Sequence, residues 1–126
     1  MLTAEQIATA KEQIKYKVPN DINHGHDDRI RVAYEWLDAQ TKTKGSIEAT
    51  LEVKHLIEDW AGGYVSRSDV EVAAFLHPEI KGQYPFFNIS RRLTRPADRR
   101  LQGLKWERTQ THHERRLEQY ARREDE

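Results

Sequence analysis

The residues best suited to chemistry lie in the segment from Tyr64 to Pro96, YVSRSDVEVAAFLHPEIKGQYPFFNISRRLTRP. If its second half is helical, four polar side chains fall along one side: Asn88, Arg91, Arg92 and Arg95. Asparagine and arginine are the residue types that pair bidentately with the edges of adenine and guanine. The segment therefore predicts a helix that lies on nucleic acid, although surface helices also adopt this pattern without any ligand.

A second group of candidates lies in the turn NHGHDD, which holds His24, His26, Asp27 and Asp28. Runs of this kind hold zinc or manganese in some hydrolases. A metal enzyme needs further ligands, and nothing in the sequence fixes the distance to the other histidines, which are His55, His77, His112 and His113. We interpret NHGHDD as a polar turn with an aspartate cap and predict no metal and no cofactor. A metal-dependent hydrolase is the third and weakest interpretation.

Other catalytic patterns are missing from the sequence. No Ser–His–Asp or Cys–His arrangement can be placed, and Gly62-Gly63 lacks the later glycine and lysine of a phosphate-binding loop. The chain has no cysteine, which excludes disulfides and thiolate metal sites and is compatible with a cytoplasmic setting. We therefore expect a protein that is not an enzyme and binds no small molecule.

Composition indicates one compact domain of 126 residues with a thin core and a charged surface. The chain is 37% apolar and 33% charged, and its mean hydropathy is −0.94. No apolar run approaches the roughly 18 residues of a membrane span, and the N-terminus lacks the apolar region of a signal peptide. We expect a cytoplasmic protein without a membrane partner.

The formal net charge of zero is unevenly distributed along the chain. Residues 1–80 hold 9 basic and 14 acidic residues, whereas residues 81–126 hold 12 basic and 7 acidic ones. Such asymmetry is a hint of a surface for nucleic acid or for an acidic partner. The alternative is that the two halves pack on each other.

Three helices must position the candidates in the first half of the chain. The first begins after Thr3, whose side chain forms a capping box with Gln6. The second begins near Asp27 and buries a stripe formed by Ile30, Ala33, Tyr34 and Leu37. The third runs over residues 47–61, with Trp60 on its buried side, and Gly62-Gly63 ends it.

The second half should alternate short elements and turns. A capping box of Ser68 and Glu71 opens a fourth helix that ends at Leu76, before His77-Pro78. Pro85 suits the first turn of a fifth helix over residues 85–94, and residues 101–108 can form a hairpin. A charged last helix starts at Thr111 and is expected to fray unless it docks.

This order of elements resembles a winged-helix domain, in which a helix, a short strand, a helix, a recognition helix and a two-stranded wing follow one another. Residues 47–61, 64–65, 68–76, 85–94 and 101–108 would fill these places, and the resemblance covers about half of the chain. It departs from the family in the long segment HPEIKGQY and in the weak alternation of the wing.

The resemblance implies a site residue by residue. In winged-helix proteins the recognition helix enters the major groove, which assigns base-edge and phosphate contacts to Asn88, Arg91 and Arg92. The wing would offer three further cations to phosphates, namely Arg99, Arg100 and Lys105. With Arg95, these residues form the predicted DNA-binding site.

Fold class and function follow as expectations. We expect a mainly α-helical single domain over residues 1–126, with N-terminal helices (1–46), a winged-helix-like core (47–108) and a charged C-terminal helix or tail (109–126). The preferred function is a small non-enzymatic DNA-binding accessory or regulatory protein. The alternative is a protein-interaction module, such as a small phage-type inhibitor of a host or foreign enzyme.

Overall fold

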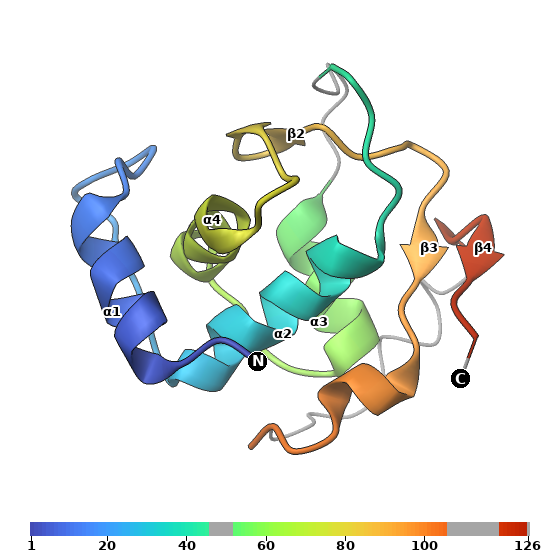
Figure 1. Cartoon of the computed structure of the whole chain (residues 1–126), viewed down its shortest axis with the longest axis horizontal. Helices are drawn as coiled ribbons and strands as arrows, with labels where there is room; N and C mark the ends of the chain where they lie inside the picture. The colour runs from blue at the N-terminus through green and yellow to red at the C-terminus, as the bar shows by residue number, and fades with distance from the viewer. Residues whose placement is uncertain (46–51, 106–118, 126) are drawn as a thin grey trace.

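The computed structural model describes residues 1–45, 52–105 and 119–125. Within these ranges the chain forms four α-helices, and the fold is mainly helical, as predicted: α1 (Ala4–Gln13), α2 (Asp27–Ala39), α3 (Val53–Ala61) and α4 (Arg67–Leu76). Helix α2 lies in the middle, packed against both α3 and α4, and α1 covers the other side of α4 (Figure 1). None of the described helices is long and apolar enough to cross a membrane.

Two predicted helix ends are confirmed. Gln6 N–H donates to the Thr3 hydroxyl over 3.1 Å, and Thr3 N–H donates to the Gln6 side chain over 2.8 Å, which completes the capping box of α1. Helix α3 ends at Gly62, which has φ 79°, a left-handed conformation that glycine adopts without the steric cost of a Cβ. The predicted start of this helix at residue 47 lies outside the described residues.

Two predicted helix caps are wrong. Helix α2 starts at Asp27, but its cap is His26, whose Nδ1 accepts a hydrogen bond from Asp28 N–H over 3.0 Å. Helix α4 is capped by Ser66 and Asp69, which exchange reciprocal bonds of 3.0 Å. Ser68-x-x-Glu71 has the same spacing, but Glu71 accepts instead from Arg67 and from Lys17 N–H.

The predicted helix over residues 85–94 is wrong, because this stretch is extended. Strands β1 (Gly82–Gln83) and β2 (Phe86–Phe87) form an antiparallel hairpin, with a cis Tyr84–Pro85 peptide in its turn. Ile89 then forms an antiparallel bridge to Lys42, beyond the end of α2. Side-chain and backbone partners outside the segment hold it extended, so the recognition helix required by a winged-helix arrangement is not present at this position.

The C-terminal part of the chain also differs from the prediction. Strand β3 (Thr94–Arg95) pairs in parallel with β4 (Arg122–Arg123), so the predicted last helix does not extend to Arg122. A 3₁₀ turn, η1 (Asp98–Leu101), occupies the start of the predicted hairpin over residues 101–108. The rest of that hairpin after Lys105 and the predicted helix start at Thr111 lie outside the described residues.

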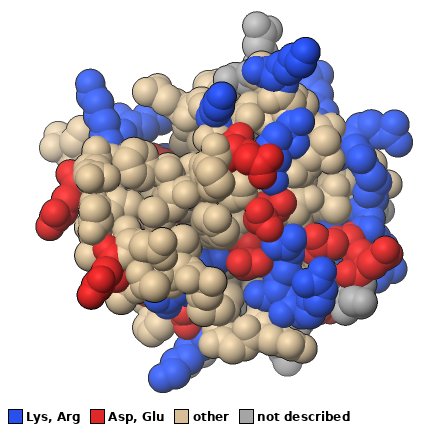
Figure 2. All heavy atoms as spheres, in the orientation of Figure 1, with Lys and Arg blue, Asp and Glu red and all other residues tan. Residues whose placement is uncertain are grey.

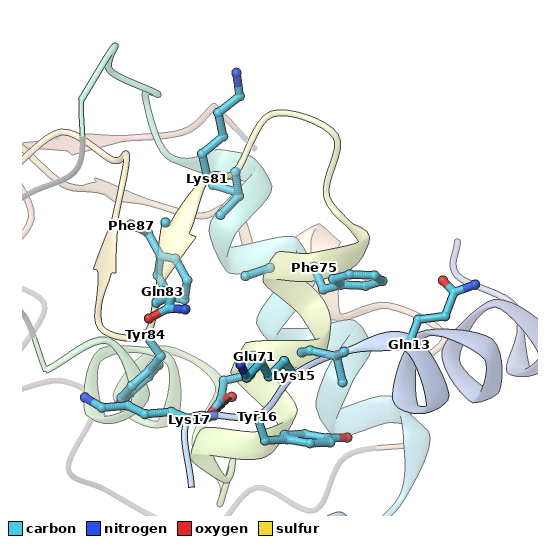
Figure 3. A pocket seen from close by; sticks show the side chains of 14 residues that line it. Gln13, Lys15, Tyr16, Lys17, Glu71, Phe75, Lys81, Gln83, Tyr84 and Phe87 are labelled. Carbon is cyan, nitrogen blue, oxygen red and sulfur yellow. Dashed lines mark hydrogen bonds between the residues drawn. The ribbon is translucent and has the colours of Figure 1, made fainter. Parts of the chain in front are cut away.

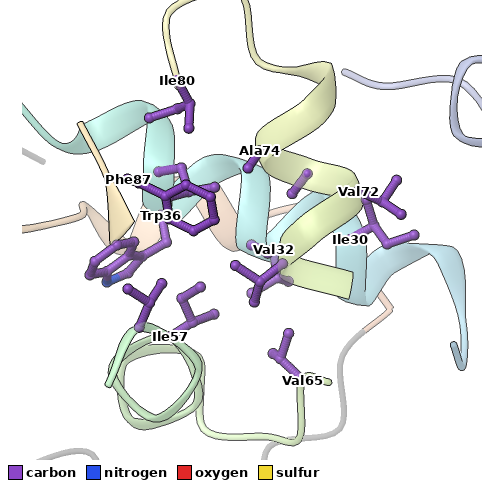
Figure 4. Close-up of a cluster of buried hydrophobic side chains, with 14 of the residues drawn as sticks. Ile30, Val32, Trp36, Ile57, Val65, Val72, Ala74, Ile80 and Phe87 are labelled. Atoms are coloured by element: carbon purple, nitrogen blue, oxygen red, sulfur yellow. The ribbon is translucent and has the colours of Figure 1, made fainter. Parts of the chain in front are cut away.

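The core fills the space between α2, α3, α4 and the β1–β2 hairpin. The predicted stripe of α2 is buried at Ile30, Ala33 and Leu37, while Tyr34 is only partly buried. Trp36 has no exposed surface and lies with Ile57 of α3 and Phe87 of β2 in one cluster (Figure 4). Burying an aromatic side chain of this size removes a large apolar area from water, which stabilises the packing of α2, α3 and the β1–β2 hairpin on one another.

Candidate functional site

Asn88 is a structural residue, which corrects its predicted place on a DNA-reading surface. Its side chain is 5% exposed. The side-chain Oδ1 of Asn88 accepts from Lys81 N–H over 2.6 Å, and its side-chain Nδ2 donates to the main-chain carbonyls of Glu79 and Thr43 over 2.9 and 3.3 Å. These bonds satisfy backbone groups of two neighbouring loops, so Asn88 closes the hairpin and is not available to a base.

Arg100 is likewise occupied within the protein. Its guanidinium donates to Glu35 over 2.8 Å, to Asp38 over 3.0 Å, and to both carboxylate oxygens of Glu124 over 2.6 and 2.7 Å. The hydrogen bonds with Glu124 raise the pKa of Arg100 above its ordinary value, and the same bonds lower the pKa of Glu124. Arg100 therefore joins α2 to the C-terminal segment, and its guanidinium is engaged by internal carboxylates at the position where the prediction placed a phosphate contact.

Arg95 is largely enclosed as well. Only 15% of its side chain is exposed, and its Nη2 forms a weak ion pair of 3.5 Å with Asp98. It lies in β3, where the prediction placed the end of a recognition helix. The predicted site thus loses three of its seven members to internal contacts.

The remaining predicted cations are exposed, but they divide into two places. Arg91 and Arg92 lie in the bend before β3, whereas Arg99 and Lys105 lie on and after η1. The parallel pairing of β3 with β4 places Arg122 opposite Thr94 and Arg123 opposite Arg95, so β4 runs alongside the strand that follows the first pair. Arg122 Nη2 donates to the main-chain carbonyl oxygen of Arg92 over 3.4 Å.

We name the four residues Arg91, Arg92, Arg122 and Arg123 the arginine edge. All four are exposed, and none forms an ion pair with a carboxylate of the described residues. The neighbouring acid Glu124 is already held by Arg100. Figure 2 shows lysine and arginine side chains gathered on the side of the molecule that carries β3 and β4. Sequence analysis missed Arg122 and Arg123, because no local pattern predicts a parallel pairing between strands this far apart.

The residues of the turn NHGHDD do not converge. His24 Nδ1 donates to Asp69 Oδ1 over 2.8 Å, and its Nε2 accepts from the Tyr16 hydroxyl over 2.7 Å. His26 caps α2, Asp27 pairs with Lys11, and Asp28 accepts from Arg31 and from Lys105 N–H. In residues 1–45, 52–105 and 119–125 no three His, Cys, Asp or Glu side chains are grouped to hold a metal ion. His112 and His113 lie outside the described residues.

A pocket of about 650 Å³ lies between the end of α1, helix α4 and the β1–β2 hairpin (Figure 3). Its walls carry Lys15 and Lys17 from the segment after α1, Phe75 from α4 and Tyr84 from the hairpin turn. No sequence pattern indicates this pocket, because the pocket depends on how the hairpin folds back towards α4. Phe87 is 1% exposed and contributes to the wall.

Three hydrogen-bonded side chains, those of Tyr16, His24 and Asp69, support one wall of this pocket. Asp69 is fully buried in the first turn of α4, so its bond to His24 anchors the loop between α1 and α2 on that helix. Burial, followed by the charges of Glu71 and Asp69, raises the pKa of Tyr16 above its ordinary value. The hydrogen bonds of His24 with Tyr16 and Asp69 therefore hold Tyr16 in place at the wall of the pocket.

The arginine edge and the pocket lie at opposite ends of the molecule, because α1 and β4 occupy the two ends of its long axis (Figure 1). No protein-family model, curated protein or solved structure matches the chain.

Proposed function

We propose that the protein is a small non-enzymatic accessory protein that binds duplex DNA through the arginine edge. The observation that supports this proposal is the β3–β4 pairing, which brings the strand of Arg122 and Arg123 alongside the strand that follows Arg91 and Arg92, with Arg122 Nη2 in contact with the Arg92 carbonyl oxygen. The edge carries four exposed guanidinium groups that have no carboxylate partner among the described residues. They form a local excess of positive charge on a chain of zero net charge. Guanidinium groups match the geometry of phosphate oxygens and remain charged at every physiological pH.

The proposed contact is with the phosphate backbone rather than with the bases. The edge is formed by a bend and two short strands, and no helix of the described residues projects from it into a groove. Phosphate contacts fix the position of a protein on the duplex but carry no sequence information by themselves. We therefore expect binding that depends on salt and varies little with DNA sequence.

A mobility-shift titration with random-sequence duplex DNA at low salt tests the proposal. The protein should shift the duplex, and the variant with Arg91, Arg92, Arg122 and Arg123 all changed to Ala should not. The double variant Lys15→Ala/Lys17→Ala is the control, because it removes exposed cations at the other end of the molecule. Equal binding by all three proteins, or no shift by the wild type, would reject the proposal.

A further inference from the structure

The pocket carries positive charge that the fold does not use. No carboxylate of the described residues pairs with Lys15 or Lys17, and both lysines are exposed. Glu71 is the acidic residue in the described lining, and it is 8% exposed. Its carboxylate already accepts from Arg67 Nε over 3.2 Å and from Lys17 N–H over 3.0 Å. A ligand in the pocket therefore meets two unpaired ammonium groups and one neutralised acid.

The same pocket exposes aromatic surface. Phe75 is 49% exposed, although it lies on α4 next to Ala73 and Ala74, which are buried. Figure 3 shows Phe75 on the α4 side of the pocket with its ring directed towards Gln13 of α1, while Gln83 and Phe87 lie on the hairpin side and Lys81 extends away from the rim. A large apolar side chain in the wall of a pocket with a polar rim is typical of a binding surface. The ligand should therefore present apolar side chains together with negative charge.

One rim of the pocket is the open edge of a strand. β1 pairs with β2 on one side, and no other described strand lies on its second side. Gly82 and Gln83 are exposed and line the pocket, so their backbone is accessible from it. An unpaired strand edge is a template for an extended peptide, which adds main-chain hydrogen bonds while its alternate side chains enter pockets.

From these three features we infer that the pocket is a docking site for an acidic, extended peptide segment of a partner protein. The segment adds to the edge of β1, places an apolar side chain against Phe75, and directs carboxylates to Lys15 and Lys17. This surface is independent of the arginine edge, so the inference does not rest on DNA binding.

The electrostatics of the pocket favour separate carboxylates over a compact phosphate. The described lining contains no arginine, the residue type suited to bidentate phosphate binding. Its cations are lysines, each of which acts as a separate point charge.

Fluorescence anisotropy with a labelled short peptide in which glutamate alternates with leucine and phenylalanine tests the inference. A peptide of the same length with lysine in place of glutamate is the charge control, and a free mononucleotide is the competitor. The acidic peptide should bind and the lysine peptide should not. Lys15→Glu/Lys17→Glu and Phe75→Ser should each weaken binding by about tenfold or more. Arg122→Glu/Arg123→Glu should leave the affinity unchanged.

Backbone amide shifts in a ¹H–¹⁵N spectrum locate the peptide and show whether each variant is folded. The inference requires the acidic peptide to shift the amides of Gly82 and Gln83 while distant amides stay in place. Absence of binding by the folded wild type would overturn it, as would equal affinity for the folded pocket variants. Displacement of the peptide by the mononucleotide would assign the pocket to nucleotides instead. A loss of DNA binding with retained peptide binding, or the reverse, separates this inference from the proposed function.

Discussion

Arg100 and the arginine edge both belong to the C-terminal part of the fold, but their environments are opposite. Arg100 is surrounded by Glu35, Asp38 and Glu124, and 12% of its side chain is exposed. The arginine edge is exposed and has no carboxylate partner among the described residues. Arg100 holds α2 and the C-terminal segment together, whereas the arginine edge presents charge to the solvent.

The difference between them comes from partners supplied by distant parts of the chain. Arg99 and Arg100 are neighbours in sequence, yet only Arg100 faces the carboxylates of α2 and the C-terminal segment. The hydrogen bonds of Arg100 use four of its five N–H donors within the fold. Binding capacity therefore follows from the charges that remain unpaired after folding, and a count of basic residues in sequence does not measure it.

The largest effect is expected from the contact that docks the C-terminal segment. Trp36 Nε1 donates to the Tyr120 hydroxyl over 2.8 Å, and burial raises the pKa of Tyr120 to about 12. Trp36→Ala should lower the free energy of unfolding by about 3–5 kcal/mol, because it leaves a cavity in the core. It should also weaken DNA binding, since β4 carries half of the arginine edge. Chemical denaturation measures the first effect, and an unchanged midpoint would contradict the core assignment.

Arg100→Ala should have the next largest effect. The substitution leaves the carboxylates of Glu35, Asp38 and Glu124 without their shared donor. Hydrogen bonds to charged groups contribute about 1.5–3 kcal/mol each at most, and the partly exposed carboxylates regain some hydration. We expect a loss of about 1.5–3 kcal/mol in thermal or urea unfolding. A loss of unfolding free energy as small as that for an exposed arginine would remove the distinction between Arg100 and the arginine edge.

Acid should weaken the contacts of Arg100 selectively. The pKa of Glu124 is lowered by its hydrogen bonds from Arg100, despite partial burial, so the folded state prefers the ionised carboxyl. Its contribution is fully present above the ordinary glutamate pKa and is lost as the pH falls through the lowered value. Unfolding curves across the acidic range should therefore show a steeper loss of stability for the wild type than for Arg100→Ala. Parallel curves would contradict the role of this pair.

The smallest effect on stability is expected at the arginine edge itself. Arg122→Ala/Arg123→Ala removes two exposed side chains whose single described hydrogen bond is the 3.4 Å contact with the Arg92 carbonyl. Each surface substitution should change the unfolding free energy by no more than about 0.5 kcal/mol. A thermal melt decides the matter, and a large decrease would show that these arginines are structural.

The helices were predictable because their signals are local. The Thr3–Gln6 box, the apolar stripe of α2 and the stop at Gly62 are all set by residues within a few positions of one another. The stretch from Phe86 to Arg95 was not predictable, because its extended form depends on distant partners. Ile89 pairs with Lys42, and Asn88 binds the Thr43 carbonyl.

The candidate sites were predictable only in part for the same reason. Arg91 and Arg92 were identified from their residue type, and both are exposed. Arg122 joins them through a parallel pairing that leaves no periodic pattern in the sequence. The internal contacts of Arg100 were not predictable either, because its carboxylate partners lie far away in the chain. Residue type indicates which chemistry is possible, and long-range pairing decides which residues remain free to perform it.

The salt dependence of duplex DNA binding tests the central claim most directly. Each phosphate neutralised by an arginine adds about −0.9 to the slope of log K against log salt concentration. Four arginines at the edge predict a slope of about −3.6 for the wild type and about −1.8 for Arg122→Ala/Arg123→Ala. The Lys15→Ala/Lys17→Ala variant should keep the wild-type slope. An edge variant with the wild-type slope, or a pocket variant with a reduced one, would contradict the account.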